Sequence, residues 1–269
     1  MWDIEPRKIL VAVDLPDPEA ALQYAVGAAS RRGCGIHLVH VARPALGSRA
    51  LDDVALIEGE LRETSQLLLS RASVRAQRLI DELAPEDDRL SVSTELSHGP
   101  VVTTLHSLSR HAAQLVLQHE GMGLDADAPA LSVTVALSAV AACPVVAVPQ
   151  GWRPASPGEG TGVVVGVEDV QRDAAAVAAA RQEAQERMAS LHVVCAADSQ
   201  LPSRVLAHAA DADLVVVARH HHKHVVGAPL AASSAELLRD CAVPVMVVDP
   251  VAGVDEPAPT PDTFSTAEG

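Results

Sequence analysis

Aromatic side chains are almost absent from this sequence of 269 residues. The complete set of Phe, Tyr and Trp is Trp2, Tyr24, Trp152 and Phe264. They form no cluster on which nucleic-acid bases could stack. Acidic residues outnumber Lys and Arg by 35 to 20, which gives a formal net charge of -15. Because a field of this sign repels phosphate backbones and anionic lipids, we expect no nucleic-acid partner.

Cysteine pairs and long apolar segments are also lacking. The four cysteines are Cys34, Cys143, Cys195 and Cys241. They contain no C-x-x-C pair and no zinc-binding spacing, which favours reduced thiols. No segment reaches the roughly 18 uninterrupted apolar residues of a spanning helix, and the first ten residues lack the apolar core of a signal peptide. These absences predict a cytoplasmic location and no membrane partner.

One arrangement occurs twice in the chain. Residues 114–149 read as a buried strand, a glycine-containing loop, an apolar helix and a second buried strand. Residues 213–249 repeat this succession as DLVVVAR, HHHKHVVGAP, LAASSAELLRDCA and VPVMVVD. Similarity of this length within one chain predicts a duplicated unit.

Strands and helices alternate ahead of the first copy. Continuous apolar runs indicate buried parallel strands, and apolar residues at helical spacing indicate amphipathic helices. The expected elements are a strand at 8–14, a helix from about Pro18 to a Gly33 cap, a strand at 35–41, a helix at 52–83, a strand at 90–96 and a helix opening at Gly99-Pro100. With residues 114–149, this makes five strands and four helices. The pattern predicts an α/β fold, an open parallel sheet with helices on both faces.

Composition divides the chain into four segments. We expect a first domain at 8–149, a Pro/Gly/Ser linker at 150–161, a second domain at 162–250 and a tail at 251–269. The tail is acidic and proline-rich, so it is predicted to be disordered.

The second domain is shorter than the first. Matching Asp14 with Glu168 gives an offset of 154 residues, whereas matching Pro144 with Pro244 gives 100. The second copy has therefore lost 54 residues (154 minus 100), about one helix plus one strand. Its sheet should contain about four strands.

Each unit resembles the universal stress protein domain. The residues that carry the resemblance are ILVAVD near the start, the long acidic helix after the second strand, the HGP helix opening and ACPVVAVP at the end of the first unit. The resemblance implies a nucleotide-binding-like fold with strand order 3-2-1-4-5. It also implies an internal pseudo-dimer, in which the two units dock through their last strands at residues 144–148 and 244–248.

ATP-binding members of that family carry the pattern G-x-x-G-x9-G-[ST] after the fourth strand. Glycines there let backbone amides approach the phosphates, and the last pair starts a helix whose positive end faces the anion. In this chain Gln118 stands in the first glycine position and Leu131 in the third, while three carboxylates and no Lys or Arg lie between them. The candidate nucleotide-binding residues that the resemblance implies are Asp14, Val41, Gly121, Gly123 and Ser132. Because the first and third glycine positions hold other residues, this loop predicts weak ATP binding or none.

The corresponding loop of the second unit has the opposite charge. A basic run follows the strand, and the carboxyl end of a parallel strand is where open α/β sheets bind ligands. Point charges could hold an anion there, and alternate histidines could bind a transition metal. A third interpretation is a plain solvated loop. The candidate anion or metal residues are Arg219, His220, His221, His222, Lys223 and His224.

The sequence carries no signature of catalysis. It contains no G-x-S-x-G elbow, no Walker lysine loop and no H-E-x-x-H helix. We therefore expect a non-enzymatic tandem regulator of the stress response, with an unidentified protein partner and no resident cofactor. Two alternatives stay open: an ATP-binding protein with at most weak ATPase activity, and a sensor of anions or metals built on the histidine loop.

Overall fold

The protein folds as a layered α/β structure in which nine strands form one sheet. A computed structural model describes residues 7–14, 17–42, 51–85, 87–119, 133–155, 162–219 and 230–249, with side chains of the long second helix described from residue 59 onward. The first nine elements are β1 (Ile9–Ala12), α1 (Glu19–Arg32), β2 (Ile36–Ala42), α2 (Leu51–Leu83), β3 (Val92–His98), α3 (Val101–Ser109), β4 (Gln114–His119), α4 (Val133–Val140) and β5 (Val145–Pro149). The remaining elements are β6 (Gly162–Val167), α5 (Ala174–Arg187), β7 (Ser190–Cys195), a 3-10 turn (Asp198–Gln200), α6 (Leu201–Ala209), β8 (Leu214–Ala218), α7 (Ala232–Asp240) and β9 (Val245–Val248).

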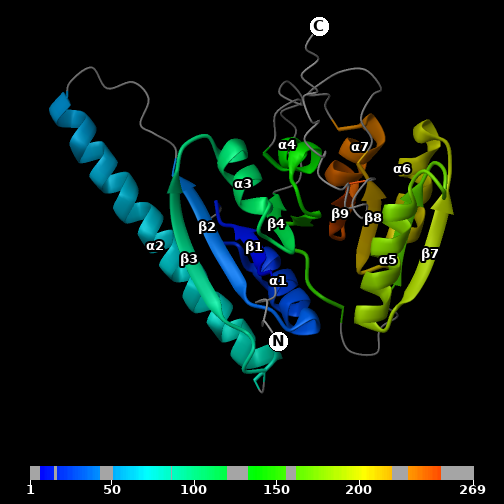
Figure 1. The fold of residues 1–269 in the computed structure, drawn as a ribbon, viewed down its shortest axis with the longest axis horizontal. Helices are drawn as coiled ribbons and strands as arrows, with labels where there is room; N and C mark the ends of the chain where they lie inside the picture. The colour runs from blue at the N-terminus through cyan, green and yellow to red at the C-terminus, as the bar shows by residue number, and fades with distance from the viewer. Residues whose placement is uncertain are drawn as a thin grey trace, which may run out of the picture.

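The strands lie in the order β3-β2-β1-β4-β5-β9-β8-β6-β7 (Figure 1). The first five strands therefore have the order 3-2-1-4-5 that the resemblance implied. All neighbouring strands are parallel except β5 and β9. The α/β class and the mostly parallel sheet are confirmed, although the two sets of strands make one continuous sheet.

An antiparallel pair at the centre of the sheet joins the two sets of strands. Val145 of β5 lies opposite Val247 of β9, and Ala147 lies opposite Val245. Both strands are buried along this seam. The pairing brings together the two segments, 144–148 and 244–248, that were expected to meet.

The second set of strands lacks counterparts of α2 and β3. β7 pairs with β6 as β2 pairs with β1, and β8 lies on the other side of β6 as β4 lies beside β1. After β7, however, the chain turns directly into α6. The 54 missing residues are thus one long helix and the edge strand beside β2, which leaves β7 at the edge of the sheet.

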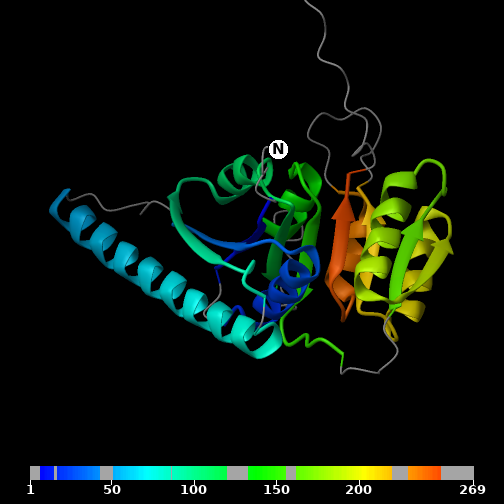
Figure 2. The same ribbon diagram turned by 60° about the horizontal axis from the view of Figure 1, so that its bottom comes forward.

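The helices divide between the two faces of the sheet. α1, α2 and α5 cover one face, where residues from all three helices share a core with alternate residues of the strands. α3, α4, α6 and α7 cover the other face, over two further groups of buried residues. Figure 2 shows α2 running past the rest of the first half of the molecule.

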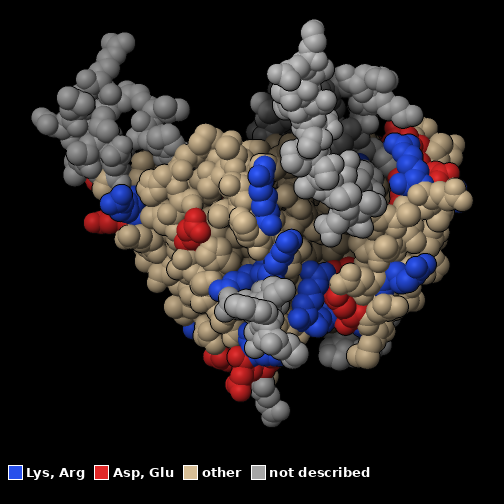
Figure 3. All heavy atoms as spheres, in the orientation of Figure 1, with Lys and Arg blue, Asp and Glu red and all other residues tan. Residues whose placement is uncertain are grey.

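The two halves also meet through buried polar side chains between α1 and α5. Arg32 of α1 forms ion pairs with Glu183 and Glu186 of α5. The hydroxyl of Tyr24 accepts hydrogen bonds from Arg187 at 3.3 Å and from Gln114 at 3.5 Å. Figure 3 shows basic and acidic side chains gathered between these helices. Because an unpaired buried charge is costly, this cluster holds the shorter half against the longer one.

Two helices of this face end in the left-handed conformation. Gly33 ends α1 with φ 62°, as expected from the sequence, and a Cβ there would lie 2.5 Å from a nitrogen of Arg89. Met188 ends α5 with φ 54° although it has a side chain. Glycine adopts this conformation readily, whereas other residues pay a steric penalty.

The segment between β5 and β6 is described only as far as residue 155. Within it, the ring of Trp152 lies 5.9 Å from that of Tyr24, and the amide of Gln150 donates to the carbonyl of His119 at 2.8 Å. The start of the expected linker is therefore anchored to the first half. The tail at 251–269 lies outside the described residues.

Candidate functional site

The carboxyl ends of β1 and β4 border a small hollow at the place where the resemblance locates a nucleotide. Asp14 lines it after β1, Gln118 lines it on β4, and Thr134 lines it in the first turn of α4. Its volume is about 70 Å³, whereas ligand pockets usually measure roughly 300 to 1,000 Å³. The hollow bordered by these described residues is thus much smaller than such pockets.

Asp14 and Val41 differ in accessibility. The side chain of Asp14 is exposed to solvent beside the hollow. Val41 is 7% exposed and packs with Leu105 in the core beneath α3. Asp14 is thus placed to meet a ligand, whereas Val41 has only a small accessible surface.

Gln118 occupies the first glycine position of the family pattern, and its side chain is already hydrogen-bonded. Its carboxamide nitrogen donates to the carbonyl of Asp17 at 2.7 Å, and its oxygen accepts from the amide of Ala21 at 3.1 Å. That amide belongs to the first turn of α1, where backbone donors lack partners within the helix. Gln118 therefore fastens the start of α1 to the end of β4, across the edge of the hollow. The sequence showed a glutamine in a glycine position, but its two partners lie about a hundred residues away.

The remaining loop candidates of the first half, Gly121, Gly123 and Ser132, lie outside the described residues. Their predicted role stays a prediction. The described chain ends at His119 on one side of this loop and resumes at Val133 on the other.

Arg219, the first residue of the basic run, is buried. It is 4% exposed, and it donates to the carbonyl of Ala141 at 2.8 Å and to Asp249 at 3.2 Å. Burial lowers the pKa of its guanidinium, and Asp249 acts in the opposite direction. Since this side chain links β8 to the segment before β5, an anion or metal site in this loop would depend on residues 220–224. Those residues lie outside the described residues.

The buried thiol of Cys143 is unreactive, and the described residues form no metal-binding group. Burial raises the pKa of Cys143 to about 12, so its thiol is protonated at neutral pH. Burial also lowers the pKa of His119, at the end of β4. Among the residues that the structure describes, no group of three or more His, Cys, Asp and Glu side chains could hold a metal ion.

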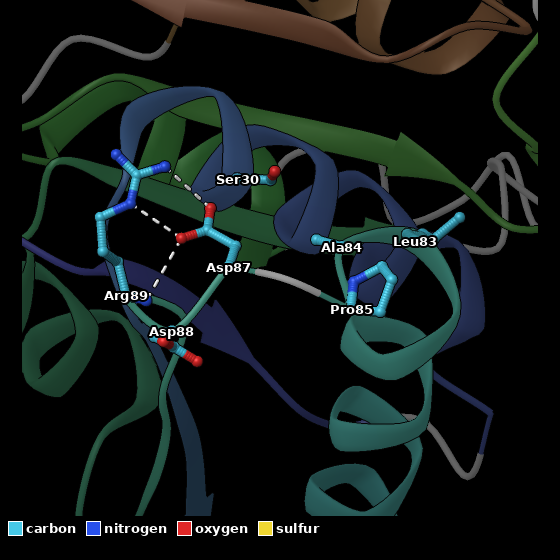
Figure 4. Close-up of a pocket in the computed structure, with 7 residues that line it drawn as sticks. All are labelled: Ser30, Leu83, Ala84, Pro85, Asp87, Asp88 and Arg89. Carbon is cyan, nitrogen blue, oxygen red and sulfur yellow. Dashed lines mark hydrogen bonds and ion pairs between the residues drawn. The ribbon is translucent and has the colours of Figure 1, made fainter.

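A shallow hollow of about 630 Å³ lies at the turn between α2 and β3 (Figure 4). Two of its charged residues pair with each other: the guanidinium of Arg89 donates to both carboxylate oxygens of Asp87, at 2.8 and 3.0 Å. The turn lies at the amino-terminal edge of the sheet, where β3 begins. We assign it a structural role, because the arginine also covers Gly33 at the end of α1.

Within the described part of the chain, no helix is both long enough and apolar enough to cross a bilayer.

Comparison with solved structures shows the same fold in proteins of low sequence identity. A universal stress protein from Archaeoglobus fulgidus DSM 4304 superposes with a TM-score of 0.65 and 13% identity, over 89% of this chain and 96% of the other. A functionally unknown protein, PA1789 from Pseudomonas aeruginosa PAO1, gives 0.60 and 19% identity, over 91% and 92% of the two chains.

Sequence comparison identifies the family. Universal stress protein Rv1996 of Mycobacterium tuberculosis (strain ATCC 25618 / H37Rv) is 29% identical over 188 residues, which are 66% of this chain and 59% of the relative. A universal stress protein of Mycobacterium bovis, Mb2019, gives the same values. The chain thus spans 59% of the length of these curated relatives. The family model described as "Universal stress protein family" matches residues 5–149, and this chain therefore belongs to the universal stress protein family.

Proposed function

We propose that this chain is a non-enzymatic regulator of the stress response, built from two universal stress protein units whose first ATP loop no longer holds nucleotide tightly. The units correspond to residues 8–149 and 162–250. They form an internal pseudo-dimer in the cytoplasm and act through contact with a protein partner, without nucleic acid or membrane.

The hydrogen bonding of Gln118 is the observation that carries this proposal. A glycine in this position would leave space for a phosphate and would leave the amide of Ala21 free. Here the glutamine side chain fills that space and takes up the amide. The acidic loop that follows adds repulsion, since each carboxylate about 6 Å from a phosphate costs roughly 0.7 to 3 kcal/mol for dielectric constants of about 80 to 20.

Support for the pseudo-dimer comes from the seam between β5 and β9. The two halves contribute equivalent last strands to an antiparallel pair, and buried ion pairs join α1 to α5 beside it. An interface of this kind resembles a domain core more than a surface contact. It favours a chain that works as one rigid body.

Calorimetry with Mg-ATP tests the loss of nucleotide binding. The wild-type chain should show no saturable binding below about 100 µM ATP, a concentration scale typical of weak ligands. Gln118→Gly with Leu131→Gly restores the glycine pattern and should gain affinity by about tenfold or more, which corresponds to 1.4 kcal/mol. Adding Asp14→Asn should abolish that gain. Binding to the wild-type chain with a dissociation constant in the low micromolar range would overturn the proposal.

An ATP-binding protein is the second candidate. The exposed carboxylate of Asp14 favours it, because this residue lies beside the hollow at the start of α4. In that case Asp14, Val41, Gly121, Gly123 and Ser132 would surround the nucleotide. The same calorimetry decides between the two, and release of phosphate from ATP by the wild-type chain would add weak ATPase activity.

The histidine loop at 220–224 provides a third candidate, a sensor of anions or metals. Its basic composition is the observation that favours it. A ligand that binds only the folded chain raises its melting temperature. An unchanged melting temperature with zinc, nickel and inorganic phosphate would eliminate this function.

A further inference from the structure

We propose that a groove at the amino-terminal ends of β1, β2 and β3 binds a small organic anion, a phosphate monoester or carboxylate attached to an apolar group. The groove lies on the face that α3 and α4 cover, at the sheet edge opposite Asp14. Its volume is about 530 Å³, within the range of roughly 300 to 1,000 Å³ found for small-molecule sites.

The groove exists because α3 is too short to cover the whole face. Leu10, His37 and Ser93 form one row across β1, β2 and β3, since each is in register with the next. α3 ends at Ser109, and Leu108 and His111 form the rim where the chain turns toward β4. This row therefore lies beyond the end of α3 and is left uncovered. Leu10 of β1 and Leu108 of α3 lie on the two sides of the opening.

Polar groups converge on the hydroxyl of Ser93. The ammonium of Lys8 lies 3.3 Å from its Oγ, and Nδ1 of His37 lies 2.8 Å from it. The hydroxyl also lies 3.3 Å from the carbonyl of Ile36, and it accepts from the ammonium of Lys8, which can only donate. Because an ammonium has three N–H bonds and this contact uses one, Lys8 keeps donors for a ligand.

Basic side chains that belong to no carboxylate pair of the described residues gather at this groove. Seven arginines form ion pairs with described carboxylates: Arg32, Arg75, Arg89, Arg172, Arg187, Arg219 and Arg239. Arg7, Lys8 and His111 all line the groove, and the ion pairs of the described residues include none of them. Unpaired basic groups that converge on one cavity, in a chain of net charge -15, favour an anionic ligand.

One carboxylate defines how the ligand would lie. Glu95 contacts Nε2 of His37 at 3.2 Å, and hydrogen bonds from Ser97 and then from His37 lower the pKa of Glu95. It would repel an anionic group at its end of the row. The anionic group is therefore expected beside Lys8 and Arg7, with the apolar part of the ligand against Leu10 and Leu108.

The test uses the two lysines of the chain, Lys8 and Lys223. Lysine labelled with ¹³C at Cε leaves the ammonium unaltered and gives each residue a separate NMR signal, assigned with Lys8→Arg and Lys223→Arg. Phenyl phosphate should move the Lys8 signal along a saturable curve at concentrations up to about 10 mM, tenfold above a dissociation constant of about 1 mM. Inorganic phosphate and phenol, the two parts of the probe, should each bind at least about tenfold more weakly.

Two variants and a matched control locate the site. Ser93→Ala and His111→Gln should each weaken phenyl phosphate about three- to tenfold, as expected when one hydrogen-bonding group is lost. Arg78→Gln removes one positive charge from an exposed position of α2 and should leave the affinity unchanged. Circular dichroism checks that each variant is folded.

Three results would overturn the proposal. The Lys8 signal could stay unmoved, or Lys223 alone could move, which would assign anion binding to the histidine loop. Equal affinity for inorganic phosphate and phenyl phosphate would show that the apolar wall takes no part. A loss of affinity in Arg78→Gln as large as in Ser93→Ala would reduce the effect to net charge.

Discussion

β2 and β7 occupy equivalent places beside β1 and β6, but their surroundings differ. β2 is covered by β3 at its edge and by α2 on one face, and Leu38 is fully buried. β7 is the edge strand at the other end of the sheet, and its residue Val193 is 47% exposed. Both residues point to the side of the sheet that carries α1 and α5. Loss of one helix and one strand has thus turned a core position into a surface position.

This difference shows how the shorter half is stabilised. α1 packs against α2 within its own half. In the described part of the shorter half, no second helix shares this core with α5, which instead contacts α1 through Arg32 and Glu183. The shorter half therefore depends on α1 of the longer half to bury one side of α5. Four predictions test this interpretation, in order of decreasing effect.

Separating the halves should have the largest effect. A fragment of residues 1–155 keeps β3, α2 and a complete set of five strands, and we expect it to unfold cooperatively in urea. A fragment of residues 162–249 loses both the seam and the α1 contact, so we expect it to lack a cooperative transition, because small domains bury too little surface to tolerate such losses. Circular dichroism during urea titration measures both. Cooperative unfolding of the shorter fragment alone would contradict the comparison.

Glu183→Ala should destabilise the whole chain by about 3 to 5 kcal/mol, because it removes the buried carboxylate that pairs with Arg187 and Arg32, and only Arg32 keeps another acidic partner, Glu186. The side chain of Glu183 is 2% exposed, and that of Arg187, which also pairs with it, is 9% exposed. Glu168→Ala is the control, because Glu168 forms an ion pair of the same i,i+4 spacing with the exposed Arg172. It should cost at most about 1 kcal/mol. Similar free energies of unfolding for the two variants would show that the ion pairs of Glu183 stabilise the chain no more than an exposed ion pair does.

Leu38→Ala and Val193→Ala compare the two equivalent positions directly. Leu38→Ala should cost about 2 to 5 kcal/mol, since it opens a cavity in the core. Val193→Ala should change the free energy of unfolding by about 0.5 kcal/mol or less, as expected of a surface residue. Urea midpoints with unchanged m-values provide the measurement. A large cost at Val193 would indicate that β7 is covered by another molecule in solution.

Met188→Gly should give the smallest effect, a stabilisation of about 0.5 to 1 kcal/mol. The substitution relieves a left-handed residue, partly offset by the greater freedom of glycine in the unfolded chain. Gly33→Ala, at the end of α1, should act in the opposite direction, because its φ is 62° and the side chain of Arg89 would also have to move away from a Cβ. Thermal unfolding of both variants would show whether the shorter half carries more local strain.

Much of the fold could be predicted from local sequence patterns. The apolar runs before Asp14 and Glu168 indicated buried strands, and Gly33 indicated the end of α1. The order of the strands came from the family resemblance, because periodicity does not say which strands are neighbours. The difference of 54 residues between the two offsets gave the size of the loss. Only the pairing of β7 with β6 showed that α2 and β3 are the elements without a counterpart.

The candidate sites depended on contacts between distant residues, which sequence spacing does not show. Gln118 could be recognised in a glycine position, but its bonds to Asp17 and Ala21 could not. Arg219 was expected in an open basic loop, and the structure buries it against Asp249. The groove beside Lys8 was missed because His37 and Ser93 approach that lysine only through the register of three strands.

The seam between β5 and β9 has a consequence for assembly. Strands that pair within one chain stay together at any dilution, because the linker keeps their effective concentration high. The same pairing between separate subunits would dissociate as the protein becomes scarce. A chain joined in this way keeps its architecture at low expression, so its folded arrangement is independent of its copy number.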